Sequence, residues 1–73
     1  MSIDAYSKLA YENEIMTEED IQNALKLSRN KVRNMLNQGI IPAIKIGKDY
    51  RITRGQFNKW INDSERKVYI VVD

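Results

Sequence analysis

The stretch from Ser28 to Gln38 carries the side chains of this sequence that are best suited to chemistry. Three asparagines, Asn30, Asn34 and Asn37, are interspersed with basic residues, and no carboxylate lies among them. An amide side chain can form two hydrogen bonds with the edge of adenine, and an arginine can do the same with guanine. Basic groups also bind phosphates. The stretch therefore predicts contact with double-stranded DNA.

A helix over this stretch would place those residues on one face. Val32, Met35 and Leu36 have the i, i+3, i+4 spacing of a buried stripe. At about 100° per residue, the three asparagines fall closest to the opposite side. The residues beside them are Arg33 on one flank, Lys31 and Gln38 on the other, and Arg29 near the boundary. Asparagine is a poor helix former, so a cluster of them favours a groove-facing role over that of ordinary solvent-facing polar residues.

The charges are segregated along the chain, although the net charge is only +2. Residues 1–27 carry −4, residues 28–55 carry +6 and residues 56–73 are balanced. In the middle segment, seven basic residues oppose Asp49 alone. Such a block is typical of a phosphate-binding surface, and an ordinary solvated surface is the alternative.

The composition argues against catalysis. The sequence has neither cysteine nor histidine, which excludes thiolate and imidazole chemistry and nearly every zinc site. Glu18, Glu19 and Asp20 follow Thr17, and carboxylates in the first turn of a helix are explained by capping and by the helix dipole. We therefore expect no enzyme activity, no cofactor and no metal.

The sequence predicts a cytoplasmic protein, associated with the nucleoid when bound to DNA. No apolar run is long enough to span a membrane, and residues 1–16 lack the pattern of a secretory signal. The absence of cysteine fits a reducing compartment.

Two short helices joined by a tight turn must position the basic stretch. Thr17 and Ser28 are the N-cap residues that begin them, and Gly39 can take the left-handed conformation that ends the second. The buried stripe expected on the first helix consists of Ile21, Ala24 and Leu25.

The periodicity changes at Pro42, which cannot continue a helix. Residues 43–46 and 50–53 alternate apolar and polar side chains, and Gly47-Lys48-Asp49 between them predicts a hairpin turn. Thr53 with Gln56 resembles the capping box of a further helix. The core residues expected on that helix are Phe57, Trp60 and Ile61.

The two ends of the chain extend beyond these elements. Residues 3–13 have helical spacing with Ser2 as N-cap, and Ile15–Met16 predicts a short strand or a bridge. Lys67–Val72 favours extended structure and predicts a third strand on the hairpin. A bare edge of that composition would pair with a second copy, so self-association through this strand or through the N-terminal helix is an alternative role.

The order of these elements resembles the excisionase family of winged helix-turn-helix proteins, which have a MerR-like DNA-binding domain. The segments that carry the resemblance are Met16–Ile21, Leu27–Val32, Gly39–Ala43, Ile46–Ile52 and Phe57–Ile61. It implies an α+β fold with three or four short helices and a wing sheet of two or three antiparallel strands. It also implies a single domain over residues 1–73 with a core at residues 16–62, whose second helix enters the major groove.

The resemblance further implies a role and a set of contacts. Proteins of this family bind repeated sites beside a recombination site, bend the DNA and bias a tyrosine recombinase (integrase) towards excision. By the resemblance, Asn30, Asn34 and Asn37 with Arg33 would contact bases, and Lys48 and Arg51 on the wing would contact the minor groove or phosphates. The full set of predicted DNA-binding residues is Ser28, Arg29, Asn30, Lys31, Arg33, Asn34 and Asn37 on the recognition helix, and Lys45, Lys48, Arg51 and Arg54 on the wing.

Three functions stay open at this point. The first is a recombination directionality factor of a phage or mobile element. The second is a small transcription regulator, such as a repressor, with the same fold. The third is a protein-interaction module that does not bind nucleic acid.

Overall fold

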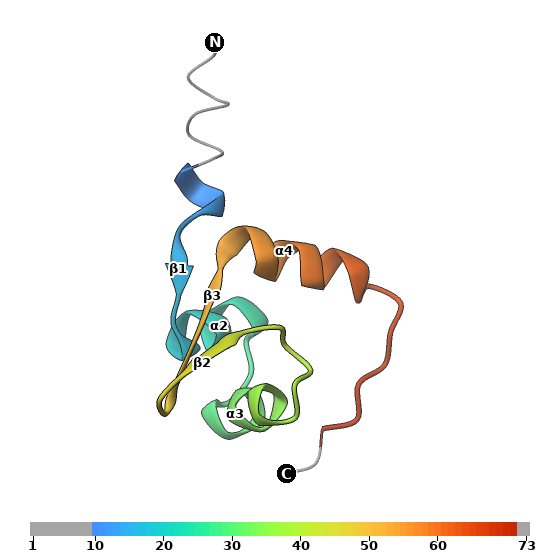
Figure 1. Cartoon of the computed structure of the whole chain (residues 1–73). Helices are drawn as coiled ribbons and strands as arrows, with labels where there is room; N and C mark the ends of the chain where they lie inside the picture. The colour runs from blue at the N-terminus through green and yellow to red at the C-terminus, as the bar shows by residue number, and fades with distance from the viewer. Residues whose placement is uncertain (1–9, 72–73) are drawn as a thin grey trace.

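The chain folds into short helices and short strands, in which two consecutive helices are followed by two consecutive strands (Figure 1). The computed structural model describes residues 10–71, in which residues 10–12 form a helical turn. The elements that follow are β1 (Ile15–Met16), α2 (Glu18–Leu25), α3 (Arg29–Asn37), β2 (Ile44–Ile46), β3 (Asp49–Thr53) and α4 (Arg54–Asp63). This α+β arrangement confirms the predicted fold class. The helix predicted at residues 3–13 and its Ser2 cap lie largely outside the described residues.

The helices α2, α3 and α4 begin at the predicted N-cap residues. The hydroxyls of Thr17, Ser28 and Thr53 each accept a hydrogen bond of 3.2 Å from a backbone N–H three residues ahead. At α2 the Asp20 carboxylate also accepts the backbone N–H of Thr17 at 2.9 Å, which completes a capping box. These bonds satisfy amides that the first turn of a helix leaves unpaired.

The cap at Asp20 makes the stability of α2 depend on pH. Hydrogen bonds from Thr17, above all from its backbone N–H, hold the pKa of Asp20 below its ordinary value. The ionised carboxylate therefore stabilises the fold above the ordinary pKa of aspartate, and this contribution is lost as the pH falls through the lowered pKa. We expect D20N to reduce the midpoint of thermal unfolding at neutral pH, and the difference from wild type to shrink on acidification.

Thermal unfolding followed by circular dichroism over a pH series measures this difference. The matched control is E19Q, which removes a carboxylate from the same turn and leaves the capping box in place. A D20N difference that stays constant into strongly acid solution would contradict the prediction.

The connection between α2 and α3 is tight, and α3 ends as predicted at a left-handed glycine. Lys26 closes α2 with φ of 56°, and Ser28 already caps the next helix. Gly39 has φ of 74°, and its backbone N–H donates to the Leu36 carbonyl at 3.1 Å. The next N–H, that of Ile40, reaches back to the Met35 carbonyl at 3.0 Å. This pair of bonds satisfies carbonyls at the end of the helix.

The hairpin belongs to a three-stranded antiparallel sheet with the order β1-β3-β2. Ile15 lies opposite Thr53 in this sheet, which confirms the short strand predicted at Ile15–Met16. The prediction of a third strand at Lys67–Val72 is wrong, because residues 67–71 form no strand. The physical reason is that β1 occupies the second edge of β3, and that the segment packs its side chains on Trp60 and the core instead of pairing with the free edge of β2.

The C-terminal segment packs with its side chains instead of pairing its backbone. The Tyr69 ring lies 6.0 Å from that of Trp60, and the Tyr69 hydroxyl is 2.7 Å from Ser64 Oγ. Val71 packs against the core, whereas Val68 and Ile70 point outwards and are 89% and 84% exposed. The segment therefore runs as an extended strap along the body of the molecule.

Every element except β2 contributes a buried side chain to a single core. The core residues are Met16, Ile21, Val32, Met35, Leu36, Ile41, Tyr50, Ile52 and Phe57. The stripe predicted on α3, formed by Val32, Met35 and Leu36, is buried as expected. This burial fixes the direction in which the opposite face of α3 points.

Four expected core residues are less buried than predicted. Leu25 is half-buried and packs against the core. Ala24 is exposed, because α2 turns only Ile21 fully into the core. Trp60 is half-buried although Tyr69 of the C-terminal strap lies against it, and Ile61 is 38% exposed at the border of the core.

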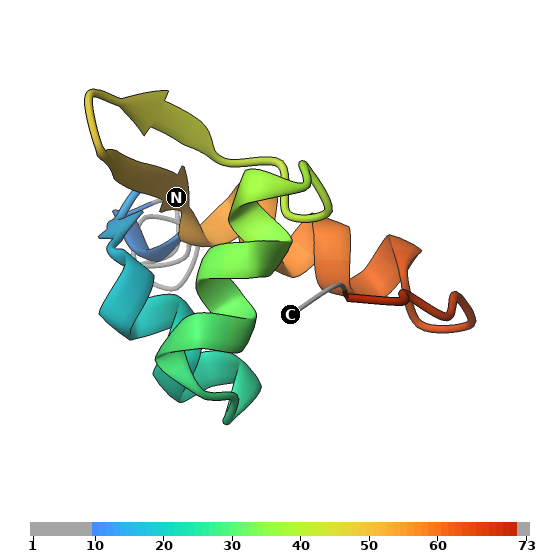
Figure 2. The ribbon, with the colours of Figure 1, turned by 90° about the horizontal axis from the view of Figure 1, so that it is seen from below.

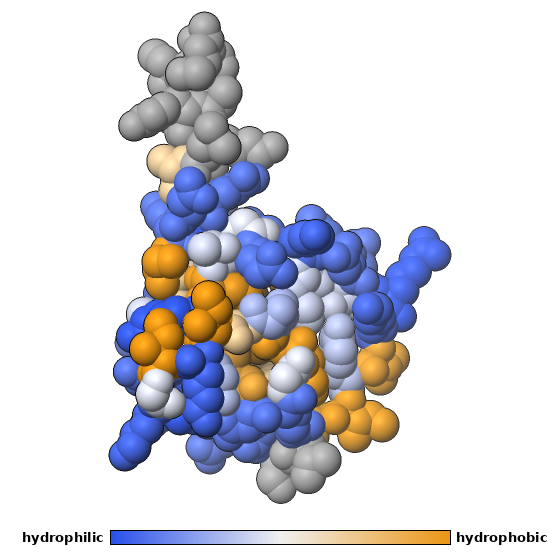
Figure 3. All heavy atoms as spheres, viewed as in Figure 1, coloured by the Kyte–Doolittle hydropathy of each residue, from blue (hydrophilic) through white to orange (hydrophobic). Residues whose placement is uncertain are grey.

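The outward side chains of β1 and β2 are apolar, whereas those of β3 between them are polar. On β3 the inward residues are Tyr50 and Ile52, and on β2 the residue opposite Tyr50 is Lys45. Ile44 and Ile46 consequently point outwards and are 68% and 60% exposed. Figure 3 shows hydrophobic surface over β1 and β2, where these residues lie with the exposed Ile15. Within residues 10–71, no helix combines the length and apolarity needed to cross a membrane.

Candidate nucleic-acid interface

The helix α3 lies at one end of the molecule with the β2–β3 hairpin beside it (Figure 2). Its buried stripe faces the core, so its other faces are turned to solvent. Ser28, Arg29, Asn30 and Asn37 are exposed, and Lys31, Arg33 and Asn34 are half-buried. The structure thus gathers the predicted recognition residues on one helix, with the predicted asparagines outside the core.

An open hollow of about 420 Å³ separates the first turn of α3 from the tip of the hairpin. The residues that line it are Glu18, Arg29, Asn30, Arg33, Lys48 and Asp49. Its walls therefore combine an amide and three cationic side chains with two carboxylates. A hollow of this composition can receive a phosphate, which the cationic groups bind, or the edge of a base, whose donors and acceptors the amide can pair with.

Arg33 connects α3 to two other elements. One guanidinium nitrogen, Nη1, donates to Glu18 Oε1 on α2, and Nη2 donates to the backbone carbonyl of Lys48 at 2.8 Å. The guanidinium carbon also lies 5.4 Å from the centre of the Tyr50 ring. The hydrogen bond to Glu18 raises the pKa of Arg33. Arg33 was predicted to contact bases, and in this structure its side chain is engaged by protein groups.

Asn37, one helical turn further along, also contacts the wing. Its Oδ1 accepts a hydrogen bond of 2.8 Å from the hydroxyl of Tyr50. Tyr50 is thus held from α3 by Arg33 and Asn37, and Lys45 Nζ lies 5.7 Å from the centre of its ring. The sequence reasoning missed the roles of Tyr50 and Glu18. The available signal for Tyr50 was its inward position in the alternating pattern of residues 50–53.

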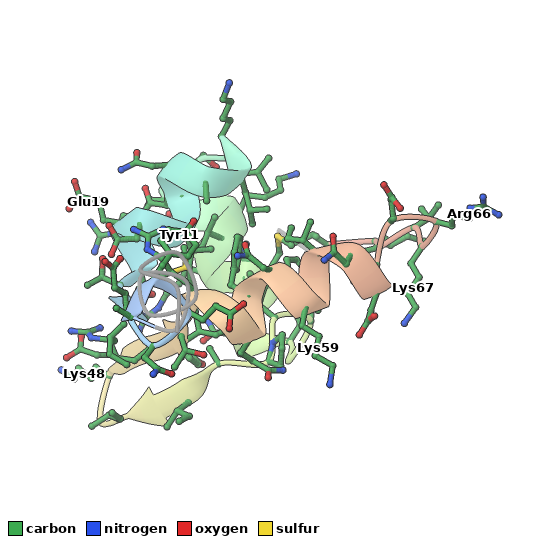
Figure 4. All side chains as sticks on the ribbon, turned by 90° about the horizontal axis from the view of Figure 1, so that it is seen from above. Tyr11, Glu19, Lys48, Lys59, Arg66 and Lys67 are labelled. Carbon is green, nitrogen blue, oxygen red and sulfur yellow. The ribbon has the colours of Figure 1, made fainter. Side chains whose placement is uncertain are left out.

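The predicted wing residues divide into two groups. Lys45 and Lys48 are exposed on the hairpin, and Figure 4 places Lys48 at its tip, at the far end of the molecule from Arg66 and Lys67. Arg51 is half-buried, and its Nη1 donates to the carbonyl of Tyr50 at 2.8 Å.

The placement of Arg54 on the wing is wrong. Thr53 caps α4, so Arg54 is the first residue of that helix. Its Nε donates to Glu14 Oε2 at 2.7 Å, and its guanidinium carbon lies 5.3 Å from the centre of the Tyr11 ring. The hydrogen bond to Glu14 raises the pKa of Arg54. Arg54 therefore ties α4 to the chain that precedes β1.

The fold and this surface together define a winged helix-turn-helix domain, in which a recognition helix and a basic hairpin lie side by side. Residues 15–65, well over half of the chain, match the model of the family described as Helix-turn-helix domain, so the chain belongs to that family. Membership supports sequence-specific DNA binding. No curated protein and no solved structure matches the chain significantly.

Proposed function

We propose that this protein is a recombination directionality factor: a non-enzymatic, cytoplasmic DNA-binding protein of a phage or mobile element that assists a tyrosine recombinase. The observation that carries the DNA-binding part is the exposure of Arg29 and Asn30 on α3 opposite Lys48 at the hairpin tip. A helix in the major groove and a hairpin on the adjacent backbone or minor groove would use both sides of that hollow.

Two further points support the recombination role. The family to which the chain belongs includes excisionase-like proteins. The five segments that resemble excisionases run from residue 16 to residue 61, within the residues matched by the family model.

Association between copies on neighbouring DNA sites is part of the proposal. The outward side chains of Val68 and Ile70 are largely exposed, and β2 is an edge strand with two exposed isoleucines. Apolar side chains on an extended strap and on an edge strand are suited to contact between copies. Such contacts would make binding to repeated sites cooperative.

The proposal is tested by gel retardation with bending analysis on a duplex that spans the recombination site of the element carrying the gene. A duplex of equal length and unrelated sequence is the control, and both are titrated over a range of salt concentrations. We expect several retarded species, a bend, and affinity that falls as salt rises. An excision assay with the neighbouring recombinase should depend on this protein.

Two results would replace the proposal by another function. Binding to a single promoter site, with no complex at the recombination site, would assign the protein to transcription regulation. No binding to any duplex at low salt would identify a protein-interaction module.

A further inference from the structure

We infer that Arg33 and Asn37 are positioning residues, which lock the wing at a fixed angle to the recognition helix instead of reading bases. The inference rests on the proposed DNA-binding function, and it changes the role of two residues that the helix pattern placed at the interface. We name the set Glu18, Arg33, Asn37, Lys48 and Tyr50 the wing clamp.

The first half of the clamp is the Arg33 guanidinium. Its two terminal nitrogens donate to acceptors on different elements, the Glu18 carboxylate and the Lys48 carbonyl, while its plane lies near the Tyr50 ring. A rigid planar fork joins two such acceptors in one geometry, which the flexible ammonium of a lysine does not. Glu18 orients the guanidinium, so the tip of the hairpin is fixed through the backbone of Lys48.

The second half is the hydrogen bond from the Tyr50 hydroxyl to Asn37 Oδ1. Tyr50 is only 6% exposed, so its ring is part of the core while its hydroxyl reaches α3. Arg33 and Asn37 are four residues apart and therefore project from the same side of α3. Two contacts one turn apart prevent the hairpin from pivoting about either of them.

A fixed wing has a direct consequence for binding. The hairpin holds Lys48 on one side of the hollow, and α3 holds Arg29 and Asn30 on the other. If both sides engage one duplex, a wing that is already ordered avoids the entropy loss of ordering it on binding. The clamp should thus raise affinity for every DNA sequence and leave the preference between sequences unchanged.

The test compares R33A and R33K with R29A, an exposed arginine one turn earlier on the same helix. Hydrogen exchange of the backbone N–H groups of residues 44–53 is measured in the protein without DNA, under conditions in which each variant is fully folded. We expect faster exchange in the hairpin for both Arg33 variants and wild-type exchange for R29A. R33K is not expected to restore wild-type exchange, because lysine keeps the positive charge but lacks the planar guanidinium that joins the two acceptors.

Binding to the preferred duplex and to its single-base variants is then measured for the same proteins. We expect both Arg33 variants to lose about 5- to 10-fold in affinity for all of these duplexes alike. Two outcomes would overturn the inference: full recovery by R33K, which would indicate a phosphate contact, and loss of preference at one base pair, which would indicate base reading. Unchanged hairpin exchange in R33A would also overturn it, even if the protein bound no DNA.

A milder pair of variants tests the second half of the clamp. Y50F removes only the hydroxyl that donates to Asn37, and N37A removes only the acceptor. We expect each to accelerate hairpin exchange, and the double variant to be no faster than the faster single one, because both remove the same bond. Additive effects would show that the two side chains act independently and would overturn this half.

Discussion

An N30D variant is expected to bind its preferred duplex about 10- to 100-fold more weakly than the wild-type protein, the loss of one bidentate base contact being worth about 1–3 kcal/mol. Asn30 is exposed on the first turn of α3 and lines the hollow that faces Lys48. The substitution keeps the size of the side chain, removes its N–H donors and adds a negative charge that repels phosphates. A carboxylate near the start of a helix is favoured by the helix dipole, so weaker binding would not arise from a damaged helix.

The measurement is a fluorescence anisotropy titration, with a duplex selected by the wild-type protein from a randomised pool. The matched control is N62D, which makes the same chemical change at an exposed position on α4. Both variants lower the net charge by one. A difference between their affinities for the duplex therefore reflects where the substitution lies and not the change in net charge. Equal affinities for N30D and N62D would show that this face of α3 does not contact DNA.

The elements of this fold were predictable because their signals are local. Each N-cap bond joins residues three apart, and the end of α3 depends on the left-handed conformation of Gly39. The stripe of Val32, Met35 and Leu36 likewise depends only on the helical period. Local sequence therefore determined where the recognition helix starts, where it stops and which face it buries.

The partners of the interface side chains were not predictable in the same way. Arg33 is bound by Glu18 and by the Lys48 carbonyl, each fifteen residues away, in opposite directions along the chain. These groups meet only because the first turn of α2 and the tip of the hairpin arrive on the same side of α3. A helical wheel predicts the direction in which the Arg33 side chain points. It contains no information on which groups of other elements that side chain will meet. Arg54 was misplaced for a related reason, since Thr53 turns the chain from the hairpin into α4.

The choice of strands in the sheet depended on competition between distant segments. Residues 67–71 have strong extended propensity, yet the two-residue β1 pairs with β3. The paired residues of β1 and β3 are 36 and 38 apart, farther than residues 67–71 are from β3, so loop length does not favour this pairing. β1 leads directly into α2, whose buried Ile21 anchors it beside the core, and this packing holds β1 against β3. The burial pattern of β2 could not be predicted from the sequence either. Ile44 and Ile46 alternate with the polar Lys45, as core residues of a strand do, and yet both are exposed.

An I21A variant is expected to lower the free energy of unfolding by about 2–5 kcal/mol, the usual cost of this truncation in a core. Ile21 is 0% exposed and is the one fully buried residue of α2. Domains of this length have a total stability of about 4–11 kcal/mol, so the loss would remove a large part of it. Urea unfolding followed by circular dichroism measures the change.

The matched control for this variant is I44A, which deletes the same atoms from a side chain that is 68% exposed. We expect that control to change the free energy of unfolding by less than about 1 kcal/mol, since only strand propensity is affected. Because Ile21 holds the helix whose Glu18 orients Arg33, I21A should also accelerate hydrogen exchange in the hairpin, although it lies outside the interface. Equal destabilisation by I21A and I44A would mean that α2 does not brace α3 through the core.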